Sequence, residues 1–229
     1  MLSVIKLIDI IISSLFNLPI IVLPMTNHLN FPIQKPLMVV ISGPSGVGKD
    51  SLIRTLLQRN LPIQFVITVN TRPPRAEEKE GVDYFFVSRE RFREMISQNE
   101  LIEYSQVYDD NKGVPRSQVE QAFSSGKDVI LRLDVQGAEK IRHMFPEAVL
   151  IFLMPANEEE WIERFKGRHG ELPRDWELRM TKFHEELQKI PLFDYIVVNP
   201  KDKLEEAVET VEAILKAEHH RTHPRSPSL

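Results

Sequence analysis

Hydrophobic and polar positions alternate along the chain with two periods, one typical of buried strands and one typical of amphipathic helices. Strands covered on both faces are predicted by continuous apolar runs at residues 37–42, 129–131, 149–153 and 195–198. Between these runs, apolar residues recur three or four positions apart, as on one face of a helix. This alternation is typical of a parallel sheet wrapped by helices, so we expect an α/β fold without internal repeats.

Local signals add further elements to this pattern. Extended segments are predicted at residues 65–69 and 101–107. Helix starts are expected at four residues that cap or open helices, namely Ser88, Pro115, Asn157 and Asp202. Strands and helices therefore keep alternating, and no linker divides the core in two.

The first part of the chain differs from the middle. Residues 1–24 are strongly apolar, which is typical of a signal peptide or a membrane anchor. The apolar run that follows Asp9, residues 10–23, is shorter than the roughly 20 residues that span a bilayer. We therefore expect no stable membrane partner, interpret Met25 as the natural start, and treat residues 1–35 as an extension.

The last residues also differ from the middle of the chain. Residues 218–229 are rich in His, Arg, Pro and Ser, a composition that predicts a solvated, disordered tail. A single domain is expected between the two ends, over residues 36–217.

The charge balance narrows the class of protein. Among 229 residues, 29 are Lys or Arg and 33 are Asp or Glu, which gives a net charge of −4. A nucleic-acid-binding protein needs surplus positive charge, so this balance argues against nucleic acid as a partner. Cysteine is absent, which excludes disulfides and thiolate chemistry and fits a cytoplasmic protein. The sequence does not indicate an oligomeric state.

The sharpest motif is Gly43-Pro44-Ser45-Gly46-Val47-Gly48-Lys49, directly after the first predicted strand. Its glycines allow backbone N–H groups to point at phosphate oxygens. The N-terminus of the following helix adds a positive partial charge that also attracts phosphate. Lys49 is expected to reach the β- and γ-phosphates and to act in catalysis. A glycine-rich turn without a ligand is the alternative, but the flanking strand and helix favour an ATP-binding loop.

The residue after this motif departs from the usual phosphate loop. A Ser or Thr normally offers its hydroxyl to Mg²⁺ there, whereas this chain has Asp50 followed by Ser51. A carboxylate is also a good oxygen ligand for Mg²⁺. We therefore expect Asp50 and Ser51 to bind the nucleotide and its Mg²⁺.

Two later stretches carry a resemblance to a known family. They are Thr71-Arg72-Pro73-Pro74-Arg75 and Gly81-Val82-Asp83-Tyr84-Phe85-Phe86-Val87-Ser88. With the phosphate loop, they make residues 36–217 resemble guanylate kinase. The resemblance implies a P-loop kinase fold with a GMP-binding region at about residues 68–115 and a mobile lid at about residues 164–179.

The resemblance also implies roles for individual residues. The acceptor phosphate would be bound by Thr68, Arg72, Arg75 and Tyr84. Arginine forks suit this task because they donate two parallel hydrogen bonds to phosphate. Glu103 and Asp134 match the family's two guanine-reading carboxylates, since guanine presents N1–H and its amine as donors.

A third group resembles the lid. Arg164, Arg168 and Arg179 would close over the transferring phosphoryl group and stabilise its charge. Ordinary solvated helix faces are the alternative for these arginines. Asn199, after the last predicted strand, matches a family position near the adenine.

Three residues depart from the family pattern. Lys112 and Val114 replace a tyrosine and a hydroxyl residue of the acceptor site, and Arg132 stands where an acid often lies. Together with Asp50, these departures resemble the plastid-type branch of the family. They put efficiency and specificity in question more than the reaction class.

These features predict an ATP-dependent guanylate kinase that uses GMP as the acceptor substrate. One alternative is a ribose 1,5-bisphosphate phosphokinase, a related class with a Gly-Lys-Asp-Ser loop that is not expected to keep the pair of Glu103 and Asp134. The other is a non-catalytic guanylate-kinase-like binding module, which would lose the phosphate-loop lysine that this chain retains as Lys49.

Overall fold

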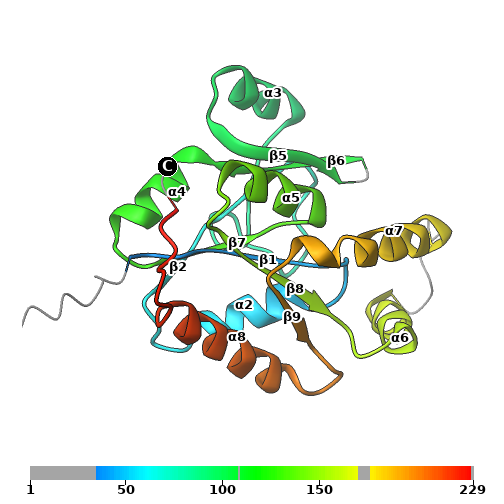
Figure 1. The fold of residues 1–229 in the computed structure, drawn as a ribbon. Helices are drawn as coiled ribbons and strands as arrows, with labels where there is room; N and C mark the ends of the chain where they lie inside the picture. The colour runs from blue at the N-terminus through cyan, green and yellow to red at the C-terminus, as the bar shows by residue number, and fades with distance from the viewer. Residues whose placement is uncertain (1–34, 108, 170–175, 228–229) are drawn as a thin grey trace, which may run out of the picture. The chain divides into compact units, whose positions relative to one another are not determined.

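The central sheet has five parallel strands in the order β2-β7-β1-β8-β9 (Figure 1). A computed structural model describes residues 35–107, 109–169 and 176–227, without the side chains of residues 107 and 167–169. The strands are β1 (Met38–Ser42), β2 (Ile63–Phe65), β7 (Asp128–Arg132), β8 (Val149–Met154) and β9 (Tyr195–Val198). The predicted α/β fold with a parallel sheet is thus confirmed.

Helices cover both faces of this sheet, because its strands are apolar on both faces. Side chains alternate along β1, so Val39 and Ile41 enter one hydrophobic core and Val40 enters another. The covering helices are α2 (Lys49–Leu57) and α8 (Leu204–Glu218) on the first face, and α4 (Arg116–Ser124) and α5 (Val135–Met144) on the second (Figure 1).

A second sheet is inserted into the chain between β2 and β7. Its four strands have the order β4-β3-β6-β5, and β5 and β6 form an antiparallel hairpin. The insert contains β3 (Val69–Asn70), β4 (Phe85–Phe86), α3 (Arg89–Ser97), β5 (Leu101–Val107) and β6 (Asp110–Pro115). Buried apolar residues give it a small core of its own, made of Val69, Phe92, Met95 and Leu101.

Two further helices, α6 (Glu158–His169) and α7 (Trp176–Gln188), precede the short 3-10 helix η1 (Ile190–Leu192). Trp161 on α6 stacks on the ring of Phe183 on α7, with 4.1 Å between the ring centroids. Its indole N–H donates to the carbonyl of Ser45 at 2.8 Å. The aromatic contact therefore joins these helices to the loop that follows β1.

Several boundaries follow the sequence signals. The Ser88 hydroxyl accepts a hydrogen bond from the Arg91 N–H, and the Asn157 side chain accepts one from the Glu160 N–H. The predicted helix starts at Ser88 and Asn157 are confirmed, as is the start after Pro115. The extended segment expected at residues 101–107 is confirmed as β5.

Three local expectations are wrong or incomplete. The segment 65–69 is not one strand, because the chain leaves the central sheet at Phe65 and joins the second sheet at Val69. Asp202 does not cap α8, since it has a left-handed backbone with φ of 58° and the N-cap residue is Lys203. Strand β6 was not predicted.

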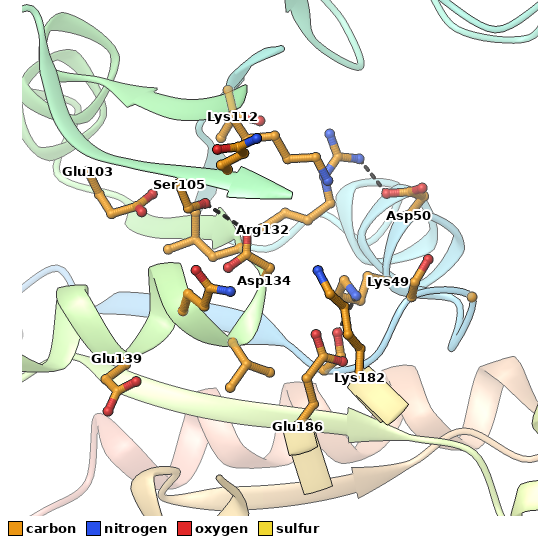
Figure 2. A pocket seen from close by; sticks show the side chains of 18 of the residues that line it. Lys49, Asp50, Glu103, Ser105, Lys112, Arg132, Asp134, Glu139, Lys182 and Glu186 are labelled. Carbon is orange, nitrogen blue, oxygen red and sulfur yellow. Dashed lines mark hydrogen bonds and ion pairs between the residues drawn. The ribbon is translucent and has the colours of Figure 1, made fainter. Parts of the chain in front are cut away.

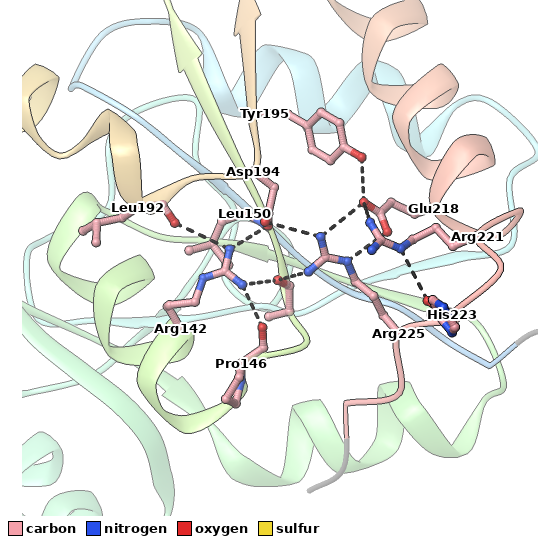
Figure 3. Close-up of polar contacts among 11 residues, drawn as sticks. Arg142, Pro146, Leu150, Leu192, Asp194, Tyr195, Glu218, Arg221, His223 and Arg225 are labelled. Atoms are coloured by element: carbon pink, nitrogen blue, oxygen red, sulfur yellow. Dashed lines mark hydrogen bonds and ion pairs between the residues drawn. The ribbon is translucent and has the colours of Figure 1, made fainter.

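The residues after α8 make more contacts than the expected disordered tail would. Arg225 pairs with Glu218 at 2.9 Å and with Asp194 at 3.3 Å, and Glu218 also accepts a hydrogen bond from the Tyr195 hydroxyl at 2.6 Å (Figure 3). Arg142 completes this group by donating to Asp194 at 2.6 Å. These five residues, called the C-terminal cluster below, lie near the beginnings of β8 and β9. These contacts attach Arg225 to the domain, while the expected disorder of residues 218–229 as a whole stays a prediction.

No helix among the described residues is long and apolar enough to cross a bilayer. Residues 1–34 lie outside the described residues. The interpretations of the apolar extension and of Met25 therefore stay predictions.

Candidate active site

The main cavity lies at the carboxyl ends of β1 and β7, where ligands commonly bind in open parallel sheets. Its volume is about 350 Å³. The loop after β1, the end of β7, the insert and α7 all contribute to its wall (Figure 2). Residues far apart in the sequence are therefore brought together there.

The loop after β1 has a backbone that requires glycine. Gly43 has a φ of 134°, and a Cβ at this position would lie 2.1 Å from the carbonyl oxygen of Leu153. Gly48, with a φ of 97°, is the N-cap of α2, and a Cβ there would lie 2.6 Å from the side-chain nitrogen of Asn199. The predicted phosphate loop is therefore a tight turn that opens directly into a helix N-terminus.

Lys49 extends its side chain back over this loop. Its Nζ donates to the carbonyls of Gly43 at 2.5 Å and Pro44 at 2.9 Å. Burial lowers the pKa of Lys49 to about 8, although the carboxylate of Glu186 on α7 opposes this shift. The lysine thus stays charged at neutral pH while it is poorly solvated, and an incoming phosphate can replace the carbonyls as its partner.

Two departures from the usual family pattern meet in the main cavity. Arg132 at the end of β7 donates to the carboxylate of Asp50 on α2 at 2.5 Å (Figure 2). Burial alone would raise the pKa of Asp50, but attraction from Arg132 and Lys49 outweighs it and holds the pKa below its usual value. Asp50 is therefore ionised at neutral pH.

Asp50 and Ser51 fit a magnesium ion that arrives with a nucleotide. Only one oxygen of Asp50 is bonded to Arg132, and Ser51 lines the same cavity. Within the described residues, no group of three or more His, Asp or Glu side chains is arranged for a metal. Mg²⁺ usually needs only one or two carboxylates, because phosphates and waters complete its shell.

All four residues expected to bind the acceptor phosphate line the main cavity: Thr68, Arg72, Arg75 and Tyr84. Arg72 is held by the two carboxylate oxygens of Glu78, at 2.6 and 2.5 Å. These hydrogen bonds to Glu78 raise the pKa of Arg72. Its guanidinium also lies 5.3 Å from the centre of the Tyr84 ring, so the two side chains are fixed together.

Both expected base-reading acids lie in the main cavity as well. Glu103 on β5 is 3% exposed, and burial, followed by repulsion from Asp134, raises the pKa of Glu103 to about 7. Asp134 is the N-cap of α5, where one oxygen accepts from the Gly137 N–H at 2.9 Å. A side chain at position 137 would crowd Glu103, since a Cβ there would lie 3.2 Å from its carboxylate.

Of the residues expected to form the lid, neither Arg164 nor Arg179 is part of the wall of the main cavity. Arg164 on α6 donates to the carbonyls of Val47 at 3.0 Å and Asn199 at 2.5 Å. Arg179 on α7 lies 5.7 Å from the ring of Phe165. The side chain of Arg168 is outside the described residues. The closure of these arginines over a phosphoryl group therefore stays a prediction.

A side cavity of about 320 Å³ lies behind the phosphate loop and contains Asn199 and Arg164 in its wall. The Asn199 side-chain amide donates to the carbonyl of Val47 at 2.8 Å. Asn199 is thus fixed between the loop and the side cavity. This placement is compatible with the expected position near an adenine.

Several residues of the main cavity were not among the expected site residues, and they include Ser105, Lys112 and Glu186. The Ser105 hydroxyl donates to the second oxygen of Asp134 at 2.8 Å (Figure 2). Lys112 on β6 lines the cavity, and within the described residues its ammonium has no hydrogen bond or ion pair. Glu186 faces Lys49 from α7, and burial raises the pKa of Glu186 to about 6. Of these three, Lys112 alone had a sequence signal, namely its departure from the family pattern.

Comparisons with known proteins agree with one another. The family described as guanylate kinase matches residues 35–218. A guanylate kinase of Shouchella clausii is 42% identical over 186 residues, which are 81% of this chain and 90% of that protein. Guanylate kinase 2, chloroplastic/mitochondrial, of Oryza sativa subsp. japonica is 40% identical over 199 residues, 86% of this chain and 70% of that protein. A crystal structure of guanylate kinase from Anaplasma phagocytophilum is similar with a TM-score of 0.69 and 33% identity, covering 82% of this chain and 89% of that one.

Proposed function

This chain belongs to the guanylate kinase family, and we propose that it transfers the γ-phosphoryl group of ATP to GMP, giving ADP and GDP. The observation that carries the proposal is the presence of two kinds of site in one cavity. A phosphate loop with Lys49 lies on one side, and the carboxylates Glu103 and Asp134 lie on the other. The first suits a triphosphate, and the second suits the hydrogen-bond donors of guanine.

Guanine selection follows from the acceptors that the cavity presents. N1–H and the exocyclic amine of guanine can donate to Glu103 and Asp134, whereas adenine has an acceptor at N1 and leaves a carboxylate unmatched. Ser105 holds Asp134 in place through its 2.8 Å hydrogen bond. Val114 takes no part, because it is fully buried in the core that also contains Val40.

The acceptor phosphate would lie between the insert and the phosphate loop. Arg72, Arg75, Tyr84 and Thr68 supply its donors. Lys112 adds a fifth group, since its ammonium lies in the same cavity and its charge is felt at both Lys49 and Asp50. A lysine at this position compensates for the charge that Asp50 adds to the phosphate-binding region.

In the reaction, an oxygen of the GMP phosphate attacks the γ-phosphorus, and the bond from this phosphorus to the bridging oxygen of ADP breaks. No side chain forms a covalent bond, so the protein contributes alignment and charge stabilisation. Lys49 supplies positive charge where negative charge develops. Asp50 and Ser51 would hold Mg²⁺, which would supply further positive charge for the phosphates of the nucleotide.

Other parts of the assignment rest on the resemblance alone. Asn199 and the side cavity are assigned to the adenine base, and Arg164, Arg168 and Arg179 to lid closure. Closure would keep water away from the transferring group. A cytoplasmic location stays a prediction.

The test is ADP formation from ATP with four acceptors compared side by side: GMP, AMP, UMP and ribose 1,5-bisphosphate. We expect kcat/KM for GMP to exceed the others by about 100-fold or more, as for sites that match buried polar groups. A preference for ribose 1,5-bisphosphate would replace the proposed function with that of a sugar phosphate kinase. Absence of turnover with every acceptor would instead indicate a binding module.

A further inference from the structure

Arg132 connects parts of the molecule that serve different substrates. One nitrogen of its guanidinium donates to Asp50 on α2 at 2.5 Å, and the other donates to the carbonyl of Asp83 in the insert at 2.6 Å. The guanidinium carbon lies 4.2 Å from the centre of the Tyr84 ring. Its side chain is only 7% exposed, so these contacts are made inside the protein.

The three contacts of Arg132 depend on the planar geometry of its guanidinium group. A planar guanidinium holds two acceptors in fixed directions and presents a face to an aromatic ring at the same time. A lysine has one flexible point charge and cannot do all three. The group at position 132 therefore fixes Asp50 and Tyr84 relative to each other.

We infer that Arg132 is a positioning residue that aligns the donor and acceptor phosphate sites, with Asp50 as its obligatory partner. The inference rests on the proposed function, because Asp50 follows the loop assigned to ATP and Tyr84 belongs to the site assigned to the GMP phosphate. In-line transfer depends on the alignment of the two phosphates, and small displacements lower the rate. Arg132 thus acts through its neighbours and need not touch either substrate.

The two departures from the family pattern support this coupling. In the family pattern that the sequence resembles, a hydroxyl residue occupies the position of Asp50, and an acid often stands at that of Arg132. Here both are replaced, by opposite charges that lie 2.5 Å apart although 82 residues separate them in the sequence. The arginine would be a buried unpaired cation without Asp50, and an acid at 132 would repel Asp50. Each of the two replacements therefore stabilises the other.

A double-mutant cycle tests the coupling. The variants are Asp50→Ser, Arg132→Asp and their combination, which restores the usual family pair. We expect each single change to lower kcat/KM for GMP, and the combined variant to exceed Arg132→Asp by about tenfold or more. If the two single substitutions lower kcat/KM by factors that multiply in the combined variant, the inference is overturned. Thermal unfolding of each variant shows whether a loss of activity reflects a loss of folded protein.

Arg132→Lys provides a second test, in which Asp50 stays unaltered. The substitution keeps the positive charge but removes the planar guanidinium. We expect the Kd for GMP to rise about tenfold while the Kd for ATP stays within about twofold. Arg54→Lys is the matched control, because Arg54 pairs with the Asp83 carboxylate from the surface at 3.6 Å and should change neither value. Equal weakening of both ligands by Arg132→Lys, or no weakening of GMP, would contradict a positioning role. If the unaltered protein phosphorylates GMP and the cycle shows no coupling, the inference fails and the proposed function stands.

Discussion

The main cavity at the carboxyl ends of the central strands and the C-terminal cluster at their amino ends each contain buried charge, but the charges are balanced differently. In the C-terminal cluster, Glu218 is fully covered and accepts hydrogen bonds from Tyr195 and Arg225. In the main cavity, Glu103 and Lys49 keep pKa values of about 7 and about 8, because burial is not fully compensated by partners. Glu103 and Lys49 are therefore underpaired where a ligand is proposed to bind, whereas Glu218 is fully paired in the C-terminal cluster.

This difference implies that the two regions contribute separately, the main cavity to function and the C-terminal cluster to stability. An underpaired buried charge is costly in the free protein, and a ligand of opposite charge or matching hydrogen bonds removes that cost on binding. A fully paired charge contributes only to the folded state, and removal of one partner exposes the full cost of the other. Substitutions in the main cavity should therefore change turnover, and substitutions in the C-terminal cluster should change unfolding.

Lys49→Ala is expected to give the largest effect on turnover. The proposed function assigns Lys49 to the charge that develops on the transferring phosphoryl group, and loss of one such group typically lowers turnover by about 100- to 1000-fold. Thermal unfolding should change little, since the hydrogen bonds of this side chain within the described residues go to two carbonyls of the loop. The exposed Lys127→Ala serves as a control for the loss of a lysine. Turnover near that of the parent would contradict the assignment of the phosphate loop.

Glu218→Ala should have the opposite signature. It leaves Arg225 without its main partner, which costs about 3 kcal/mol for a buried pair and lowers Tm by roughly 6 to 12 °C in a domain of this size. The kcat with saturating GMP should not change at a temperature where the variant is folded. Glu209→Ala, an exposed position on the same helix, is the control. An unaltered Tm would show that the cluster does not stabilise the fold.

Lys112→Met sharpens the comparison within the main cavity. The substitution keeps the length of the side chain and removes a charge assigned to the acceptor phosphate. One charge-assisted hydrogen bond is worth about 1.5 kcal/mol, so KM for GMP should rise roughly tenfold. KM for ATP should stay nearly constant. A selective loss of ATP affinity would instead place Lys112 on the donor side.

The pH dependence of GMP use is the smallest expected effect. Burial and Asp134 raise the pKa of Glu103 to about 7, so this carboxyl is protonated below that pH and becomes an acceptor above it. KM for GMP should therefore fall several-fold as the pH rises from about 6 to about 8. The GMP phosphate titrates near pH 6, so Glu103→Gln is the reference. If KM for GMP depends on pH in the same way in parent and variant, the protonation of Glu103 does not affect guanine binding.

The sequence was sufficient for the central sheet and the phosphate loop, because both depend on local patterns. Apolar runs predict β1, β7, β8 and β9, and the glycine spacing predicts the loop that follows β1. The prediction of a single extended segment at residues 65–69 is wrong because this apolar run is divided between two sheets. Strand β6 was missed because Asn111, Lys112 and Gly113 have little strand preference of their own, and pairing with β5 imposes the extended conformation.

The polar contacts of the site depend on residues that are distant in the sequence. The departures at Asp50 and Arg132 were visible, but only the parallel arrangement of β1 and β7 shows that their side chains form an ion pair. Ser105 carried no signal, because a serine in a strand is common and its bond to Asp134 depends on how the insert meets α5. The same holds for Arg225, whose partners lie on α8 and before β9.

The central claim is that the main cavity reads guanine with Glu103 and Asp134. The most direct test is kcat/KM for GMP and for AMP in the parent, in Glu103→Gln and in Asp134→Asn. The parent should prefer GMP, and each substitution should reduce the GMP-to-AMP ratio by about tenfold or more, because an unmatched buried polar group costs roughly 1 to 3 kcal/mol. Ratios that remain unchanged in both variants would contradict the claim, even if the protein proved to be a kinase.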